Sequence, residues 1–502
     1  MSDVPHYNMF IDGQWVEGSS VWGVKEPSTG ETCATVAYGG VSYTDRAIEA
    51  ATRAHTEGVW RKKTPAERAD VLDRIHQILS AKVEDLAHLV ASENGATVRC
   101  ATAFHVGVAL GSLKYFADQT RVYEFRKANE PTQLPLPAQG YIHRDPVGVV
   151  GAILPFNFPL VLGIWKIGPA LAAGNTIVVK PDENTPQTLL EFAKAAEEAG
   201  LPPGVFNVVL GDGEAVGGRL AEHPGIRKIA FTGSTEVGKI VMRGAASNVK
   251  KVTLELGGKG PSIILDDANL DLAVRGSLFA FLMYNGQVCE SGTRTFVPRA
   301  LYDDVVQLMV EATKTLKIGD PHDPDTDFGP IIDQEAVDRI QQMVAHAVEQ
   351  GATVAYRGAL DLDEKFRGGT WVAPVILSNV TNEMDIARNE AFGPVGVVIP
   401  YDTVEEAIEM ANDSEYGLAA GVWGGDEERA IDVASQLEAG TVWVNDWHMF
   451  PLTGPFGGFK QSGLGRELGA HAFDEYTEEK YIHVAANQDL QQRAYGLLFG
   501  HS

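Results

Sequence analysis

The segment VGVVGAILPFNFP, residues 147–159, decides the fold of this 502-residue chain. Residues 147–154 are almost entirely apolar and predict a buried strand, which two prolines end in a fixed turn. Residues 160–173 then predict a helix, and residues 176–180 predict a second short strand. This alternation is typical of a parallel sheet with helices on both faces, so we predict an α/β fold.

The alternation of strands and helices continues in two series. The first continues with a helix that Thr185 and Pro186 cap and Gly200 ends, and then with segments at 205–210, 213–222, 228–232, 235–246 and 251–254. The second series runs from Pro261 to about Val444, with segments at 262–265, 301–316, 395–400 and 404–411. A boundary near Gly257-Gly258 separates them. The sequence therefore predicts two doubly wound, Rossmann-like α/β domains, in which ligands bind beyond the carboxyl ends of the strands.

Two β segments, residues 139–144 and 479–485, lie outside both series. Each would leave an unpaired edge in a monomer, which favours pairing elsewhere or between subunits.

Composition excludes several classes of protein. The net charge of −26, from 41 basic and 67 acidic residues, argues against nucleic acid or an anionic membrane as a partner. The longest apolar stretch, residues 147–156, is far shorter than the roughly 20 residues of a membrane-spanning helix. Three cysteines are too few for a disulfide framework, and the first residues have no pattern of a secretory signal. We therefore expect a cytoplasmic protein.

Cys289 is the candidate nucleophile. It lies in NGQVCESG, residues 285–292, a polar segment flanked by glycines, where backbone amides can approach a thiolate or an oxyanion. An inert buried cysteine would also fit, and Cys33 and Cys100 have only that interpretation.

Two further polar residues follow strands of the first series. Glu255, in ELGGK, could accept a proton from a thiol or a water if burial raises its pKa, although an ion-paired surface glutamate would fit as well. Asn157, held between prolines, could donate to an oxyanion or simply cap a turn.

Two segments of the first series suit a dinucleotide. FTGSTEVG, residues 231–238, predicts a strand, a glycine turn and a helix whose N-terminus would bind a pyrophosphate. KPDE, residues 180–183, ends another strand with a carboxylate that could bind ribose hydroxyls and repel a 2′-phosphate, which favours NAD over NADP. A plain strand-to-helix connection and solvated charges would look the same.

Together these motifs resemble the aldehyde dehydrogenase superfamily, of the hydrolytic type that does not transfer to coenzyme A. The resemblance covers nearly the whole chain, because the family's motifs occur in order: PFNFP at 155–159, KPDE at 180–183, FTGSTEVG at 231–238, ELGGK at 255–259, GQVCESG at 286–292, NEAFGPV at 389–395 and PFGGFKQSGLGRE at 455–467. It implies an NAD-binding domain over residues 1–126 and 147–256 and a catalytic domain over 257–468. It also implies an oligomerisation arm and C-terminal tail over 127–146 and 469–502, and a homo-oligomer, either dimer or tetramer.

The resemblance also implies roles for single residues and no metal. Cys289 would be the nucleophile, Asn157 would supply the oxyanion hole, and Glu255 would activate the water that releases the acid. The cofactor would be held by Lys180, Glu183, Gly233, Ser234, Gly257, Glu390, Phe392 and Phe156, the last standing where many members have a tryptophan.

The resemblance places a group of mostly aromatic residues near the aldehyde, namely Phe158, Leu162, Trp165, Tyr284, Trp447, His448 and Phe450. Such a lining favours an apolar or aromatic aldehyde. The same rings could surround a cationic aminoaldehyde or betaine aldehyde, with Glu290 supplying charge.

Two other classes of function remain open. A cysteine hydrolase would need a histidine paired with Cys289, for which His448 is the nearest candidate. A non-catalytic scaffold would be expected to have lost the active-site residues, which are present here.

Overall fold

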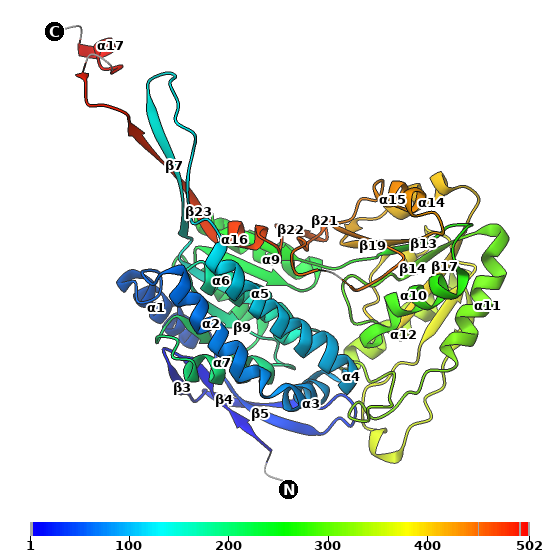
Figure 1. The fold of residues 1–502 in the computed structure, drawn as a ribbon. Coiled ribbons are helices and arrows are strands. Elements are labelled where there is room, and N and C mark those ends of the chain that lie inside the picture. Colours follow the sequence, from blue (N-terminus) through cyan, green and yellow to red (C-terminus); the bar gives the residue numbers. More distant parts are fainter. Residues whose placement is uncertain (1–3, 450, 491–492, 500–502) are drawn as a thin grey trace.

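The structure is a computed structural model that describes residues 4–449, 451–490 and 493–499. Figure 1 shows two α/β bodies side by side and an arm that projects from the first of them. Each body is built on its own sheet, and the arm carries a third, so the α/β class predicted from the sequence is confirmed.

The first sheet has eight strands in the order β22-β12-β11-β8-β9-β10-β2-β3. Its central strands are parallel and match the predicted segments: β8 (Val149–Ile153), β9 (Thr176–Lys180), β10 (Phe206–Val208), β11 (Lys228–Thr232) and β12 (Lys251–Glu255). The chain runs from β8 outward to β9 and β10 and then returns to the opposite side of β8 with β11 and β12. The carboxyl ends of β8 and β11 therefore meet at a topological switch point, where such sheets bind ligands.

The edges of this sheet were not predicted. The antiparallel strands β2 (Met9–Ile11) and β3 (Gln14–Val16) extend one edge, and β22 (Gly463–Leu464) pairs with β12 at the other. The strand β22 comes from the part of the chain assigned by sequence to the catalytic domain. It therefore ties the C-terminal segment to the strand that carries Glu255.

Helices cover both faces of the first sheet. The helix α6 (Pro159–Ala172) is buried along its whole length, which explains why its sequence is apolar on every side. Further helices are α1 (Val41–Glu57), α2 (Pro65–Ser80), α3 (Val83–Asn94), α5 (Val108–Val122), α7 (Gln187–Glu198) and α9 (Thr235–Ala245). The segment predicted as one helix over 213–222 is a π-helical turn, η2 (Gly213–Gly218), followed by α8 (Arg219–Glu222).

The second sheet has seven strands in the order β15-β16-β17-β14-β13-β19-β20. The strand β15 (Thr353–Arg357) is antiparallel at one edge, and the parallel strands are β13 (Pro261–Ile264), β14 (Arg294–Pro298), β16 (Val375–Ser378), β17 (Val395–Tyr401), β19 (Ala419–Trp423) and β20 (Thr441–Val444). Its helices include α10 (Leu270–Leu282), α11 (Tyr302–Thr313), α12 (Gln334–Glu349), α14 (Val404–Asn412) and α15 (Glu427–Ala434).

The two β segments outside both series pair with each other. The strands β7 (Ala138–Pro146) and β23 (Thr477–Ala485) are antiparallel over their full length, and β6 (Arg126–Ala128) adds a third strand. Figure 1 shows this sheet extending away from the body, close to the C-terminus. Most of β23 is exposed, and among the described residues its outer edge has no partner strand.

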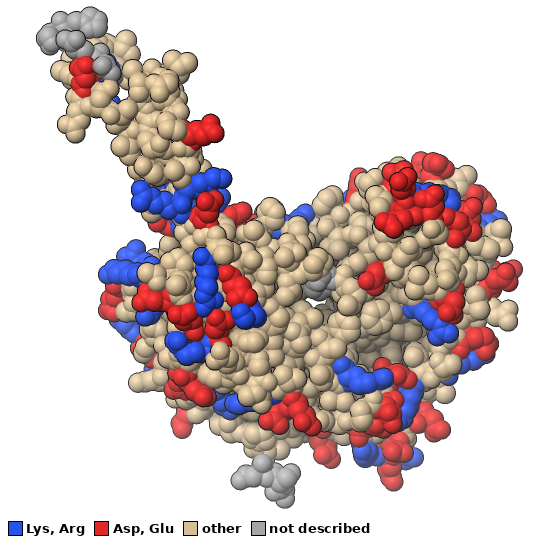
Figure 2. Space-filling model, viewed as in Figure 1, with Lys and Arg blue, Asp and Glu red and all other residues tan. Residues whose placement is uncertain are grey.

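Charge is distributed unevenly over the face shown in Figure 2. Basic side chains gather where the arm leaves the body, and acidic side chains cover the region of α14 and α15. Within the described ranges, no helix combines the length and apolarity that crossing a membrane requires.

Candidate active site

The loop that carries Cys289 begins at an irregular turn after α10. In this turn, η4 (Met283–Gly286), Tyr284 and Asn285 both have positive φ angles, 46° and 58°. The Asn285 side chain anchors the turn, because its Nδ2 donates to the carbonyl of Pro330 at 2.6 Å and its Oδ1 accepts from the amide of Gly329 at 3.0 Å. The nucleophile loop is therefore held by side chains rather than by regular secondary structure.

The ELGGK segment lies directly against this loop. A Cβ atom on Gly258 would lie 2.2 Å from the carbonyl oxygen of Cys289, and one on Gly260 would lie 2.7 Å from that of Ser291. Only glycine permits so close an approach of two backbones. The glycines after Glu255 thus allow the end of β12 and the cysteine to come together.

Asn157 reaches the same loop from the end of β8. Its side chain is buried, and its Nδ2 donates to the carbonyl of Gln287 at 3.0 Å, two residues before Cys289. Its own carbonyl accepts from Asn94 Nδ2 at 3.2 Å, which fixes the turn. The amide therefore lies beside the cysteine, and one of its two hydrogens remains for another acceptor.

Glu255 is the last residue of β12 and is 2% exposed. Neither carboxylate oxygen has a hydrogen-bond partner among the described residues. Burial raises the pKa of Glu255 well above its usual value, and the nearby Glu467 carboxylate raises it further. Glu467 is held by Lys166 at 2.7 Å, and Lys166 also donates to Thr232 at 2.7 Å. A carboxyl group with a raised pKa is a stronger base when it is ionised, which suits it to proton transfer.

Glu290, which follows the cysteine, contacts it directly. The Cys289 thiol donates to Glu290 Oε2 at 3.3 Å, and Glu290 Oε1 lies 3.2 Å from His448 Nδ1. Burial raises the pKa of Cys289 well above its usual value, and the negative charge of Glu290 raises it further. Because its pKa is raised, Cys289 is protonated and exists as a thiol.

Cys289 opens into a small cavity of about 40 Å³. It is lined by Phe104, Val108, Phe158, Val161, Leu162, Trp165, Met283, Cys289, Glu290, His448 and Phe456. Four of these were predicted to surround the aldehyde, namely Phe158, Leu162, Trp165 and His448. Tyr284 and Trp447 are not in this lining: the Tyr284 ring packs on Phe158, and Trp447 Nε1 donates to the carbonyl of Glu290 at 3.0 Å, behind the cavity. Phe450 lies outside the described residues.

The residues predicted to hold the adenosine half of a dinucleotide lie at the carboxyl ends of strands in the first sheet. Lys180 Nζ donates to Glu183 Oε2 at 2.9 Å, after β9. Gly233 and Ser234 form the turn from β11 into α9, and the Ser234 hydroxyl caps this helix by accepting from the amide of Val237 at 3.3 Å. The exposed N-terminus of α9 therefore faces solvent beside the switch point.

The remaining predicted cofactor residues cluster between the two bodies. Glu390 Oε1 accepts from the amide of Gly258 at 3.0 Å, and a Cβ atom on Gly257 would lie 2.4 Å from Glu390 Oε2. Burial raises the pKa of Glu390 to about 7. The rings of Phe156 and Phe392 meet edge to face with centroids 5.7 Å apart. The structure thus brings residues from three distant segments close together.

Sequence reasoning missed the buried Lys166–Glu467 pair and several cavity residues. Lys166 is the only charged residue in an otherwise apolar helix, which was a signal that could have been used. Phe104 and Val108 had no signal, because the π-helical segment η1 (Ala101–Gly107) that leads into α5 belongs to no recognised motif.

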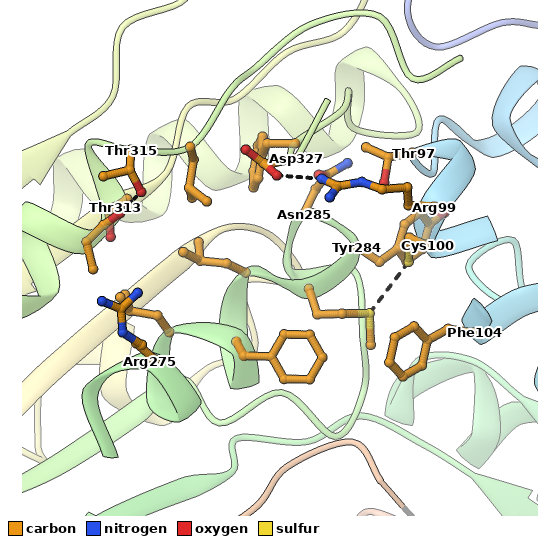
Figure 3. Close-up of a pocket in the computed structure, with 17 residues that line it drawn as sticks. Thr97, Arg99, Cys100, Phe104, Arg275, Tyr284, Asn285, Thr313, Thr315 and Asp327 are labelled. Atoms are coloured by element: carbon orange, nitrogen blue, oxygen red, sulfur yellow. Dashed lines mark hydrogen bonds and ion pairs between the residues drawn. The ribbon is translucent and has the colours of Figure 1, made fainter. Parts of the chain in front are cut away.

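A larger cleft, of about 410 Å³, lies on the other side of Phe104 and Met283 from Cys289. Figure 3 shows Arg99 paired with Asp327 among the residues that line it. The sulfur of Cys100 lies 3.8 Å from that of Met283. Burial raises the pKa of Cys100 to about 12, as expected for an inert thiol. No cluster of three or more metal-ligating side chains occurs among the described residues.

A doubly wound sheet of the kind that binds dinucleotides has its switch point close to a cysteine and a buried glutamate, and this arrangement is a candidate active site of an oxidoreductase. The chain belongs to the aldehyde dehydrogenase family, whose model matches residues 15–482.

Relatives and solved structures support this assignment over the full length. The chain is 40% identical to the betaine aldehyde dehydrogenase of Bacillus subtilis, over 95% of this chain and 96% of the relative. It is 40% identical to mouse aldehyde dehydrogenase 1A1, over 97% and 96%. The NAD+ complex of aldehyde dehydrogenase from Bacillus cereus superposes with a TM-score of 0.92 at 40% identity, covering 96% of this chain and 97% of that one. The betaine aldehyde dehydrogenase of Staphylococcus aureus with NAD+ gives 0.93 at 37% identity, covering 96% of each.

Proposed function

We propose that this enzyme oxidises an aldehyde to a carboxylic acid with NAD, through a thiohemiacetal and then a thioester on Cys289. The observation that carries the proposal is the meeting of Cys289, Asn157 and Glu255 beside the switch point of the first sheet. These residues come from three segments far apart in the sequence, and each has the chemistry that one step needs.

The residues present fit a dinucleotide. The N-terminus of α9 offers free amides to a pyrophosphate, and the Lys180–Glu183 pair offers partners to ribose hydroxyls. Gly257 has no Cβ that would fill the space beside Glu390, which supports a role for this carboxylate at the nicotinamide half. When bound, NAD supplies the acceptor for the hydride that leaves the aldehyde carbon.

The cysteine and the asparagine act in the first half of the reaction. The Cys289 thiol releases its proton to solvent, and the thiolate sulfur attacks the aldehyde carbon to form a tetrahedral alkoxide. The free hydrogen of the Asn157 amide donates to this oxygen, together with the backbone amide of Cys289. Because both donors are fixed by the surrounding structure, little reorganisation accompanies the development of charge.

Glu255 acts in the second half. Its buried carboxylate removes a proton from a water molecule, which attacks the thioester and releases the acid and the thiol. The absence of a hydrogen-bond partner within the described chain leaves both oxygens ready to accept that proton. The presence of Glu255 also favours hydrolysis of the thioester over transfer of its acyl group to coenzyme A.

The Glu183 carboxylate favours NAD over NADP. It follows the Lys180 strand end and carries a negative charge where an additional phosphate would have to lie, which would repel that phosphate. Solved structures of relatives are complexes with NAD+, which supports NAD as a cofactor.

The cavity supports an apolar or aromatic aldehyde. Apart from Cys289, Glu290 and His448, its lining residues are apolar or aromatic. Its volume of about 40 Å³ is well below the roughly 150 Å³ that encloses a benzene ring, so it takes a short aldehyde or the aldehyde end of a longer one.

A cationic betaine aldehyde is the second candidate, favoured by the 40% identity to a relative of that name. The aromatic rings of the cavity could contact its quaternary ammonium group, and a free carboxylate would add charge attraction. Glu290 is the carboxylate in the lining, and it is already engaged by Cys289 and His448.

Neither of the other classes is supported by the site. The His448 ring contacts Glu290 rather than Cys289, so it is not placed as the base of a cysteine hydrolase. A non-catalytic scaffold would not need the buried polar residues Asn157, Glu255 and Glu290 close to the Cys289 thiol.

We further propose that the chain divides functionally as its sequence suggests, with a cofactor domain at 1–126 and 147–256, a catalytic domain at 257–468, and an assembly arm with tail at 127–146 and 469–502. The exposed edge of β23 supports pairing between subunits in a dimer or tetramer.

A panel of aldehydes followed by NADH formation, with NAD and NADP in parallel, tests the proposal. We expect turnover with apolar aldehydes and NAD, and slower turnover with NADP and with betaine aldehyde. Rapid ester hydrolysis without cofactor, together with no NADH from any aldehyde, would contradict it.

A further inference from the structure

A hydrogen-bonded chain leads from the nucleophile into the cavity wall. It runs from the Cys289 thiol to Glu290 Oε2 at 3.3 Å, and from Glu290 Oε1 to His448 Nδ1 at 3.2 Å. All three residues line the cavity, and both Glu290 and His448 are buried. This chain brings the only ionisable side chains of the lining to the reacting sulfur.

This series of hydrogen bonds determines which nitrogen of His448 carries a proton. The Glu290 carboxylate can only accept hydrogen bonds, so Nδ1 of His448 must be the donor. The other nitrogen, Nε2, is then an acceptor if the ring is neutral and a donor if the ring is charged. It is buried and has no hydrogen-bond partner within the described part of the chain.

Aromatic side chains pack around the His448 ring. The residue has a φ of 62°, and its ring meets that of Phe279 edge to face at 5.2 Å. The indole of Trp447, next to it in the chain, donates to the carbonyl of Glu290 at 3.0 Å. His448 is 3% exposed and lines the cavity, and its Nε2, which has no hydrogen-bond partner among the described residues, is buried.

We propose that Nε2 of His448 binds a hydroxyl group of the substrate, so that the preferred aldehydes are hydroxyaldehydes. The proposal rests on the proposed function and names its substrate class. A hydroxyl group both donates and accepts, so it pairs with Nε2 whichever form the ring takes. A substrate with this group gives the buried nitrogen its partner, whereas the parent aldehyde leaves it unpaired.

The rest of the cavity limits this substrate to a single polar group on an apolar skeleton. Trp165 Nε1 is bonded to the Ser112 hydroxyl at 3.0 Å, and Glu290 is bonded on both oxygens. The remaining side chains of the lining are apolar or aromatic. A second hydroxyl or a charge would therefore be buried without compensation.

The test compares kcat/KM for aldehydes that differ by one hydroxyl group. Suitable pairs are acetaldehyde with glycolaldehyde and propanal with lactaldehyde, which are short aldehydes, followed by NADH fluorescence. At least one hydroxylated aldehyde should exceed its parent by about tenfold. The ratio is independent of the fraction of active enzyme, so partial misfolding of a variant does not alter it.

Three variants test whether the ratio of kcat/KM for a hydroxylated aldehyde to that for its parent aldehyde depends on Nε2 of His448. His448→Asn keeps an amide in the position of Nδ1 but has nothing at Nε2, so the ratio should fall towards one. His448→Gln places an amide at the position of Nε2 and should retain part of the preference. His471→Asn, at an exposed histidine, is the matched control and should retain all of it.

Two results would overturn the inference, and each differs from a failure of the proposed function. In the first, the unmodified enzyme oxidises apolar aldehydes but prefers no hydroxylated aldehyde over the matching aldehyde without the hydroxyl group. Alternatively, His448→Asn keeps the full ratio, which shows that the preference arises elsewhere. If no aldehyde of any kind yields NADH, the proposed function itself is wrong.

Discussion

The carboxylate of Glu290 lies 3.3 Å from the sulfur of Cys289, its neighbour in the chain. A negative charge at this distance opposes the loss of the thiol proton, in addition to the effect of burial. Cys289, the proposed nucleophile, is therefore held as a thiol, which is less reactive than a thiolate.

Replacement of Glu290 should make the thiol more reactive. In Glu290→Gln the charge is absent, so the pKa of Cys289 falls towards its usual value and more thiolate exists at a given pH. We expect alkylation by iodoacetamide, without cofactor, to become markedly faster, because only the thiolate reacts. The double variant with Cys289→Ala shows whether the label is on this cysteine. An unchanged rate would remove Glu290 from control of the thiol.

Replacement of Cys289 should separate binding from chemistry. Cys289→Ala removes the only atom that can form the thioester, so NADH formation should fall to background. The switch point of the first sheet is unaffected, so quenching of tryptophan fluorescence by NAD should persist. Cys33→Ala, at a thiol in the N-terminal region with a pKa raised to about 12 by burial, is the control and should keep its activity. Substantial oxidation by Cys289→Ala would rule out the covalent route.

Replacement of Glu255 should expose the two halves of the reaction. Glu255→Gln cannot take a proton from water, so a rapid burst of NADH should precede a steady state slowed about a hundredfold or more. Stopped-flow fluorescence measures both phases. Equal steady-state rates for variant and parent enzyme would exclude Glu255 as the base.

The pH dependence of the steady state should reflect the raised pKa of Glu255. A base acts in its deprotonated form, which exists above its pKa. When deacylation limits the rate, activity should therefore rise with pH through a midpoint well above that of an ordinary glutamate, and Glu255→Gln should lack this limb. A rise centred at the usual pKa of an exposed carboxyl group would disagree with the burial of Glu255.

A methyl group on Gly258 should displace the nucleophile loop. Its carbon would lie 2.2 Å from the carbonyl oxygen of Cys289, a backbone atom that cannot move without the loop. Gly258→Ala should therefore lose most activity and lower the melting temperature. In Gly40→Ala the added carbon meets nothing within 4 Å, so this variant should be close to the parent enzyme. Equal activity of the two would show that the loop tolerates movement.

Replacement of Glu183 should weaken the preference for NAD. Glu183→Gln keeps a hydrogen-bonding group but removes the charge that repels a phosphate, and it leaves Lys180 without its ion-pair partner. We expect the ratio of kcat/KM for NADP to that for NAD to rise about tenfold. A ratio that does not change would place the discrimination elsewhere.

Much of the architecture could be predicted from the sequence, because strand and helix patterns are local. The strands from β8 to β12 lie at or within a residue or two of the predicted segments. The antiparallel edges β2, β3 and β22 could not be predicted, because each is only two or three residues long and gains its hydrogen bonds from segments far away in the chain.

The sequence by itself determined the candidate nucleophile and its motifs, since glycines, prolines and a lone polar residue after an apolar strand express local backbone requirements. Only the tertiary structure decided which side chains share the cavity. It brought His448 to Glu290, left Tyr284 and Trp447 behind the wall, and linked Lys166 to Glu467 across the first body. These contacts join residues that are distant in the chain, and burial, which sets the pKa values of Cys289 and Glu255, depends on the packing of the whole molecule.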